Sequence, residues 1–581
     1  MEEKVPSAEG QVEVLKPSEL NLTYDDIDEE PSLHVRTYIA LAAMFMLNLA
    51  QMVALQGPPT FLNSIGADLK APQTQVWIVT VLPIVQAALG PIVSSASDLF
   101  QARKALLVCC CTISFIGSAI APRATSVYQV IAAQTLIGFG FATVPLAYCV
   151  PSEIVPNKWR PMTQAVMNIA ACLGAMVAPV ILGSFLQVDR TRGWRNFYWV
   201  QMGMWAITAL GIFAGYRPPK RHTRLDHLSG LQKIQKMDLY GCGLLILGLC
   251  VFLAGLNLGG GLYSWINARV LATVIIGGMI LVAFFLYEWR GTKTGILHHE
   301  IFNGADGTGR TAAISMFLIA VEAIMATPYY LFYPVQTAAL FDTEPMKIVA
   351  RQEAFWIGCI IGSVIFGFWS TKYKTIREPM AGGFLIFTGG QVGFSTIQPG
   401  QSVNAIAFCT ISGFGFGVVL VLVVAGVQLC TPHHLIATST AVVTTTRGMA
   451  GAIAIAMYSA VFRTRIEQRL PAYVGEAALS SGLSPDSVPA FVGAFLTNDT
   501  ALLTNTTGVT PKMLAASVVA MKQAYADSLR MVFIMAVPFG VAAIIACYFL
   551  ASINKMMHYG VDAPVELLHA KNYQVNDSQA V

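Results

Sequence analysis

Fourteen long runs of apolar residues constrain the fold of this 581-residue chain more than any other feature. A helix needs about 20 mostly apolar residues to cross a bilayer, whereas barrel strands are short and alternate in polarity. The continuous runs therefore predict an all-α polytopic membrane protein with fourteen transmembrane helices. The runs lie at about 37–56, 76–96, 104–122, 127–149, 161–185, 195–216, 239–258, 266–288, 310–335, 349–371, 379–397, 402–428, 435–462 and 526–552.

The composition agrees with a chain that is mostly in contact with lipid. Charged residues make up 12% and hydrophobic residues 55%, and the mean hydropathy is +0.60. A soluble domain usually carries about 25% charge, so a soluble enzyme and a nucleic-acid binder are excluded. The 11 cysteines lie in or beside apolar runs without metal-ligand spacing, and the nine histidines fall in loops or tails. We therefore expect no metal site, no cofactor and no disulfide framework.

The order of apolar and polar segments predicts two six-helix bundles with two further helices inserted between them. The acidic N-terminal segment lacks the basic and apolar parts of a signal peptide. The expected units are an acidic tail (1–36), a first bundle (37–216), a basic loop (217–238), two inserted helices (239–289), a loop (290–309), a second bundle (310–553) with an outer loop (464–525), and a tail (554–581).

Lysine and arginine in the short loops indicate the orientation, because they are enriched on the cytoplasmic side. With the N-terminus inside, the cytoplasmic loops hold most of the basic residues, so both termini should be cytoplasmic. This orientation puts the loop between the last two helices outside. Two acceptor sequons in that loop, at Asn498 and Asn505, predict glycosylation there.

An internal duplication relates the two bundles. Gly-Phe-Gly-Phe at 138–141 recurs at 413–416, an offset of 275, and Gly174 meets Gly448 at an offset of 274. Substrate sites of repeat transporters lie near the midplane between the repeats. The offset of 274 maps Asn48 onto Glu322, and both lie near the middle of their helices, so the duplication selects this pair as a functional candidate.

Glu322 and Arg447 are the charged residues nearest to the centres of their helices. Charges inside a bilayer are costly and persist mostly for function. On a helix, Tyr329 and Tyr333 share the face of Glu322. A carboxyl group in such a cavity is suited to proton coupling or to recognition of a polar ligand. A structural hydrogen bond to a neighbouring helix is the alternative.

Arg447 does not deprotonate in practice. It could therefore serve as the counter-charge of Glu322 or of an anionic ligand, and a structural ion pair between helices is the alternative. Asn48, Gln51 and Gln134 are uncharged polar residues inside the membrane. Each can line a substrate cavity or hold helices together by hydrogen bonds. The predicted substrate cavity comprises these amides with Glu322, Tyr329, Tyr333 and Arg447.

The loop after the second helix resembles a motif of the major facilitator superfamily. The superfamily's signature is G-x-x-x-D-x-x-G-R-R-K, and here Asp98, Arg103 and Lys104 match it, whereas Ser94, Gln101 and Ala102 depart from it. The resemblance implies a cytoplasmic gate formed by these charges. It also implies two six-helix bundles that rock around a midplane cavity.

The fifth helix is similar to the antiporter motif of the 14-helix drug:proton branch of that superfamily. Gly174, Pro179 and Gly183 match the motif, and Ala178 replaces a glycine. The fourth helix has Gln134 where the branch normally has an arginine, so the proton role falls to Glu322.

Segments of the C-terminal half resemble the fungal trichothecene efflux pump and siderophore transporter group. They are 431–440, 446–451, 470–473 and 482–485. The resemblance implies proton-coupled export of a toxin-like or other small secondary metabolite, and uptake of ferric siderophores is the alternative.

The expected partners are a small amphipathic organic substrate, protons and the lipid bilayer, with the chain acting as a monomer. ATP is not expected, because the glycine-rich stretch 304–311 has Arg310 in place of the phosphate-loop lysine and no preceding strand. Two other classes of membrane protein are less consistent with the sequence. A membrane enzyme would need intramembrane histidines or a nucleophile with its base, which the sequence does not show. A non-transporting receptor would show no flux of substrate under any gradient. The plasma membrane is the expected location, and the vacuolar membrane is the alternative.

Overall fold

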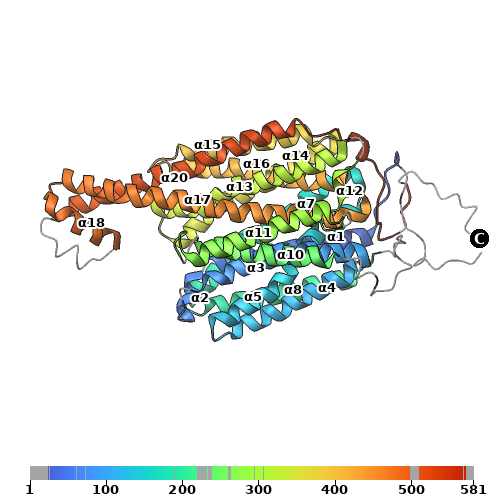
Figure 1. Ribbon diagram of the computed structural model, residues 1–581, viewed down its shortest axis with the longest axis horizontal. Helices are drawn as coiled ribbons and strands as arrows, with labels where there is room; N and C mark the ends of the chain where they lie inside the picture. Colours follow the sequence, from blue (N-terminus) through green and yellow to red (C-terminus); the bar gives the residue numbers. More distant parts are fainter. Residues whose placement is uncertain are drawn as a thin grey trace, which may run out of the picture.

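The computed structural model describes residues 24, 27–60, 62–71, 74–189, 191–218, 232, 238–259, 263–292, 295–304, 307–497, 509–566 and 568–570. Long helices run side by side along one axis (Figure 1). They are α1 (Val35–Thr60), α2 (Leu62–Asp68), α3 (Val76–Phe100), α4 (Arg103–Ile120), α5 (Val127–Phe141), α6 (Val144–Ile154), α7 (Arg160–Val188), α8 (Gly193–Gly215), α10 (Leu239–Asn257), α11 (Ala268–Arg290), α12 (His299–Phe302), α13 (Thr308–Leu340), α14 (Pro345–Tyr373), α15 (Arg377–Ser395), α16 (Ser402–Cys430), α17 (Ile436–Ser480), α18 (Val488–Thr497) and α20 (Pro511–Cys547).

In the described ranges, thirteen helical stretches are long and apolar enough to cross a membrane, and α5 with α6 forms one of them. The remaining predicted span, 379–397, is α15, which begins with Arg377 and Glu378 and is less apolar for that reason. It packs along α16 and α20. The predicted all-α membrane fold is confirmed.

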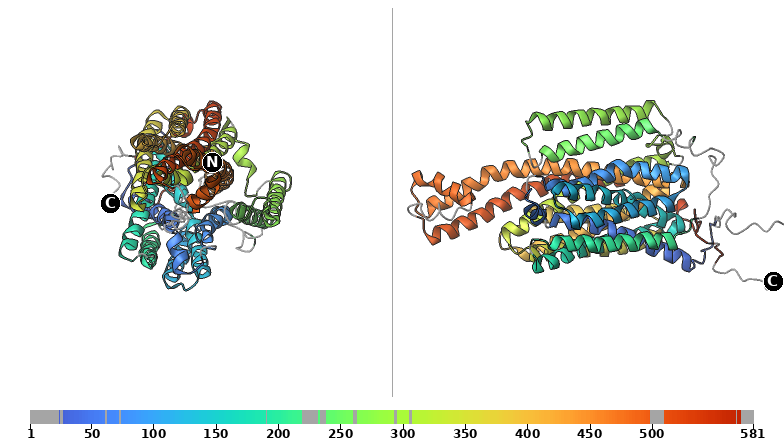
Figure 2. Two further views of the ribbon diagram at one scale, coloured as in Figure 1. Left: turned by 90° about the vertical axis from the view of Figure 1, so that its left-hand side faces the viewer. Right: turned by 90° about the horizontal axis from the view of Figure 1, so that it is seen from below.

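Two large apolar cores divide the helices into two halves. One core is built mainly from α1 to α8, and the other mainly from α13 to α17 and α20, and each also includes a few residues of the facing half from α17 or α7. The inserted helices α10 and α11 lie to one side of both halves (Figure 2). They pack through Leu245 and Leu249 against Ala87 of α3 and Val442 of α17.

The repeated Gly-Phe-Gly-Phe motif marks a close helix contact in each half. A Cβ atom at Gly138 would lie 2.8 Å from Val85 of α3, and one at Gly413 would lie 2.0 Å from the carbonyl oxygen of Phe355 in α14. Only glycine allows such an approach. The repeat in the sequence is therefore a repeat in packing, with α5 against α3 and α16 against α14.

Segment 464–525, expected as an outer loop, is largely helical. α17 continues to Ser480, α18 follows, and α20 begins at Pro511. Together they form a hairpin that projects from one end of the molecule (Figure 1). A small core of Val474, Phe491 and Met513 holds it together. The predicted glycosylation sites Asn498 and Asn505 lie outside the described residues.

The first and last described segments of the chain lie at the opposite end of the molecule from this hairpin. Tyr24 pairs with Val561 and Pro31 with Ala570 through isolated β-bridges. We call this side the terminal end, and the side with the helical extension the hairpin end.

Candidate functional site

Glu322 and Arg447 form an ion pair between α13 and α17. Arg447 donates from Nε to Oε2 of Glu322 at 2.9 Å and from Nη2 to Oε1 at 3.2 Å. Such a two-point contact fixes the guanidinium plane as well as its charge. The sequence left open whether Arg447 would serve Glu322 or a ligand, and the structure places it on Glu322.

The two partners differ in their access to solvent. Glu322 is 0% exposed, whereas 34% of the Arg447 side chain is accessible although the residue lies deep among the helices. A Cβ atom at Gly451 would meet nothing within 4 Å. Gly451 lies one turn after Arg447 on the same face of α17, so an open space lies beside the guanidinium.

Aromatic side chains surround this space. Tyr330 is 37% exposed and stacks on Trp356, with ring centroids 5.9 Å apart. Arg447 lies over the ring of Phe416 at 5.7 Å, and Phe416 also meets Tyr330 edge to face. Tyr148 of α6, in the other half, is close enough to Arg447 to interact electrostatically. The space therefore lies where the two halves meet.

Tyr329 and Tyr333, which the sequence placed with Glu322 in the cavity, are buried within the C-terminal core instead. Tyr329 stacks on Phe355 at 3.9 Å and on Tyr333 at 5.2 Å, and its hydroxyl lies 2.6 Å from Sγ of Cys409. Tyr330, which the sequence prediction did not select, is the tyrosine that borders the open space.

The three amides predicted to line the cavity lie inside the N-terminal half. Asn48 donates to the carbonyl oxygen of Ala147 in α6 at 3.4 Å, besides that of Met44 in its own helix at 2.9 Å. Gln51 donates to the carbonyl oxygen of Gly140 at 3.0 Å. Gln134 donates to the Tyr198 hydroxyl at 2.9 Å. All three are buried. Their hydrogen bonds match the alternative interpretation, in which each joins helices.

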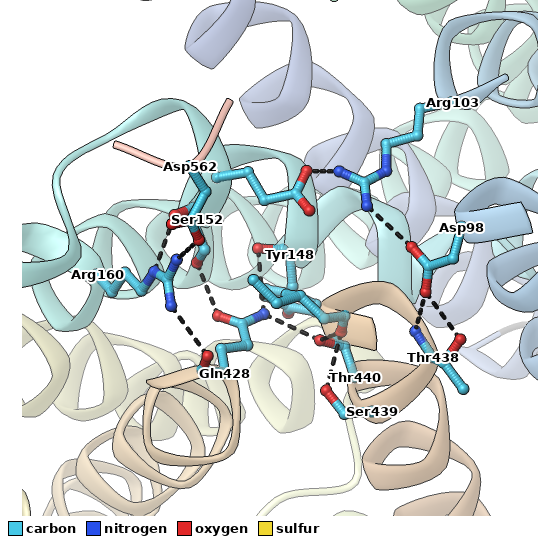
Figure 3. A network of polar contacts seen from close by, with 12 residues as sticks. Asp98, Arg103, Tyr148, Ser152, Arg160, Gln428, Thr438, Ser439, Thr440 and Asp562 are labelled. Atoms are coloured by element: carbon cyan, nitrogen blue, oxygen red, sulfur yellow. Dashed lines mark hydrogen bonds and ion pairs between the residues drawn. The ribbon is translucent and has the colours of Figure 1, made fainter. Parts of the chain in front are cut away.

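Asp98 and Arg103 take part in a network that joins the two halves at the terminal end (Figure 3). Arg103 bonds Asp98 at 2.9 Å and also pairs with Glu153 of α6. Asp98 accepts from the backbone N–H and the hydroxyl of Thr438 at 2.9 and 2.8 Å. A carboxylate of one half thus caps the first turn of α17 in the other, where the helix dipole favours negative charge.

Lys104, the third residue of the predicted gate, points elsewhere. Its ammonium group lies 5.0 Å from the ring of Phe213 in α8. The structure thus separates Lys104 from Asp98 and Arg103.

Gln428 of α16 forms the second part of the network. Its side-chain oxygen Oε1 accepts a hydrogen bond from the Ser152 hydroxyl at 2.7 Å, and its backbone carbonyl oxygen accepts one from Arg160 Nη1 at 2.9 Å. Its amide donates to Thr440 at 3.1 Å. We call the two parts together the latch (Asp98, Arg103, Ser152, Glu153, Arg160, Gln428, Thr438 and Thr440; Figure 3).

Sequence reasoning missed Glu153 and Gln428, although the repeat holds a signal for them. The offset of 275 that relates the Gly-Phe-Gly-Phe motifs also relates Glu153 to Gln428 and Thr163 to Thr438. Both halves therefore supply the latch from equivalent helix ends.

The antiporter-like segment of α7 serves as a packing surface. A Cβ atom at Gly174 would lie 2.6 Å from the carbonyl oxygen of Leu49 in α1. Ala178, Pro179 and Gly183 are buried. Towards the other half, α7 meets α14, where Sγ of Cys172 and Sγ of Cys359 are 3.4 Å apart. Within the described ranges, no group of three or more His, Cys, Asp or Glu side chains could hold a metal ion.

Two helical halves, a polar centre between them and contacts that close one end define a membrane transporter of the major facilitator fold. The solved structure of the proton:xylose symporter XylE has a TM-score of 0.53 at 11% identity, over 90% of this chain and 98% of that one. The human organic anion transporter MFSD10 gives 0.51 at 11% identity, over 87% and 100%. At such identities the likeness shows the fold alone.

The family is more specific. Residues 9–577 match the model of the fungal trichothecene efflux pump family, and the chain belongs to that family. The MFS-type transporter prx5 of Penicillium rubens is 26% identical, over 77% of this chain and 80% of its own. Efflux pump FUS6 of Gibberella moniliformis is 22% identical, over 92% and 91%. Membership confirms the resemblance read from the sequence, and the protein is a multi-pass membrane transporter.

Proposed function

We propose that the protein exports a small amphipathic secondary metabolite across the plasma membrane in exchange for protons, working as a monomer with both termini in the cytoplasm. The Glu322–Arg447 pair carries this proposal, because it joins the most buried carboxylate of the site to the open space through a single guanidinium. The printed names of efflux-pump relatives support the direction, and the basic loops support the orientation.

The latch supports alternating access. The interhalf hydrogen bonds of the latch lie at the terminal end, and those of Asn168 and Cys172 with α14 lie further towards mid-depth. With that end on the cytoplasmic side, the described conformation is closed towards the cytosol. Substrate would enter from the cytosol once the latch opens, and it would leave towards the hairpin end.

Proton coupling follows from the chemistry of the pair. With Glu322 ionised, both of its oxygens hold Arg447 against α13 and leave the adjacent space free for substrate. Protonation removes the charge that holds the guanidinium, which itself keeps its proton. Arg447 then turns into the open space and displaces the substrate. Proton and substrate therefore compete, as exchange requires.

The site suits substrates with a flat apolar body and polar oxygen atoms. Tyr330, backed by the buried ring of Phe416, offers an accessible ring face, and the accessible edge of Arg447 offers N–H donors. Glu322 presents no accessible oxygen, so an organic cation would meet only the guanidinium.

Metabolite profiling tests the function. Cells that lack the gene should accumulate one or a few metabolites and lose them from the medium, and re-expression of the wild-type chain should reverse both changes. Expression of Glu322→Gln at equal surface level should not. If iron-limited growth depends on the gene and no metabolite accumulates, the protein takes up ferric siderophores instead.

A further inference from the structure

The chain after α20 crosses from one half of the molecule to the other at the terminal end. Met557 is fully buried in the C-terminal core, and Val565 is buried in the N-terminal core. We call residues 557–566 the tail strap. Its two apolar anchors belong to the two bodies that must separate if the terminal end opens.

Between these anchors the strap binds the segment that joins α6 to α7. The backbone N–H of Lys158 donates to the carbonyl oxygen of His558 at 2.9 Å, and that of Asn157 donates to Gly560 at 3.1 Å. The Lys158 ammonium donates to the Tyr559 hydroxyl at 2.7 Å. Burial lowers the pKa of the His558 imidazole below its ordinary value. The strap is thus held by backbone and side chains along its length.

The strap also contacts the latch itself. Asp562 forms an ion pair with Arg160, whose guanidinium also bonds Gln428 of the other half. The N–H of Ala563 donates to the carbonyl oxygen of Glu153, whose side chain holds Arg103. The same residues that close the latch therefore dock the strap, so the two form one cooperative unit.

The end of the strap is fastened to the first helix. One carboxylate oxygen of Glu566 accepts hydrogen bonds from the backbone N–H of His34 and from the hydroxyl of Thr37. A carboxylate at this position also matches the positive end of the α1 dipole. The N-terminal half is thereby held at the starts of both α1 and α7.

We propose that the tail strap is a built-in clamp that holds the terminal end closed and must detach from the N-terminal half in each transport cycle. Ten residues cannot follow a separation of the two halves while keeping hydrogen bonds to 153–160 and an anchor in each core. Docking therefore favours the closed state, and release permits the open one.

A reversible cross-link tests the requirement for release. Cysteines replace Lys158 and Tyr559, whose side chains touch, and a bifunctional thiosulfonate joins them in sealed vesicles. We expect flux of the metabolite identified by profiling to stop and to return on reduction. The matched control joins cysteines at Asp68 and Arg195, an ion pair within one half at the hairpin end, and should leave flux unchanged. Full flux with the 158–559 link complete would overturn the proposal.

Native Cys430 reports opening without any substrate. It lies two residues after Gln428 and is buried, so a membrane-impermeant maleimide should reach it only when the terminal end opens. Asp562→Asn and Glu566→Gln should each raise its labelling rate severalfold, and the 158–559 link should suppress it. Labelling rates equal to wild type in both variants would refute the clamp. This measurement needs no proton gradient, so it stands apart from the proposed export.

Discussion

The two halves of the molecule share a framework but carry their charges at different depths. At the terminal end, the charged residues of the latch all come from the N-terminal half: Asp98, Arg103, Glu153 and Arg160. The helices of the C-terminal half contribute only uncharged side chains and backbone groups to it. At mid-depth the order is reversed. Asn48 of the first half is neutral, whereas Glu322 at the equivalent position is ionisable and paired with an arginine.

This difference shows how a duplicated chain divides two tasks. A latch between rigid bodies needs polar contacts where the bodies meet. Charges that are paired within one half, facing neutral partners on the other, are not left without a counter-charge when the contact breaks. A proton-responsive centre needs a carboxylate whose surroundings change with its charge. The equivalent helices pack alike through glycine, but the polar residues placed on them separate gating from coupling.

The largest expected effect on transport comes from removing the negative charge of Glu322. In Glu322→Gln, Arg447 has no counter-charge and occupies the substrate space permanently, so proton-driven export should fall to the level of vesicles without protein. Flux of the profiled metabolite under an imposed pH gradient measures this.

The double variant Glu322→Gln, Arg447→Gln serves as the matched control for that experiment. It removes the displacing cation together with its partner, so downhill flux should return without dependence on the gradient. Gradient-driven export by either variant would contradict the coupling role of the pair.

Asp98→Asn should weaken the latch without altering the Glu322–Arg447 ion pair. Asp98 accepts one hydrogen bond from a guanidinium and two from Thr438, and hydrogen bonds to charged groups contribute about 1.5–3 kcal/mol. The closed state should lose stability, and maleimide labelling of Cys430 should rise by about tenfold or more.

Lys104→Gln controls for the loss of charge at the same loop. Lys104 contacts Phe213 rather than the latch. The rate at which maleimide labels Cys430 in this variant should therefore match the wild type. Equal increases in both variants would show that loop charge in general, and not the contact between Asp98 and Thr438, closes the terminal end.

Tyr330→Ala should affect substrate binding more mildly. Tyr330 is the accessible ring beside Arg447, and an aromatic contact contributes about 0.5–1.5 kcal/mol beyond its buried area. The concentration for half-maximal flux should rise several-fold while the response to the pH gradient is retained. Tyr329→Phe, which alters a buried tyrosine, is the control and should leave that concentration unchanged.

The sequence predicted the membrane fold and the repeat because both rest on features spread over whole helices, such as apolar runs and close-packed glycines. It selected Glu322 and Arg447 because charges at mid-depth are rare. It did not distinguish Tyr330 from Tyr329. Helical periodicity predicts the face on which a side chain lies, but it does not predict which part of that face the neighbouring helices cover. α14 and α16 cover Tyr329 through Phe355 and Cys409.

The latch was only half predicted for a related reason. Asp98 and Arg103 stand in a recognisable local motif, whereas Glu153 and Arg160 read as ordinary charges at helix ends. Their partners, Arg103 and Asp562, are separated from them by 50 and 402 residues. Contacts over such separations depend on how helices and segments far apart in the chain pack together, which no local pattern encodes.

Asn48→Ala tests the comparison from its neutral side and should give the smallest effect on transport. Asn48 is buried and bonds the carbonyl oxygens of Met44 and Ala147, so its loss should cost about 1–3 kcal/mol of stability. Thermal unfolding in detergent should shift down, while flux per folded molecule keeps its dependence on the pH gradient. If the variant lost that dependence, the first half would take part in coupling, and the division of tasks between the halves would fail.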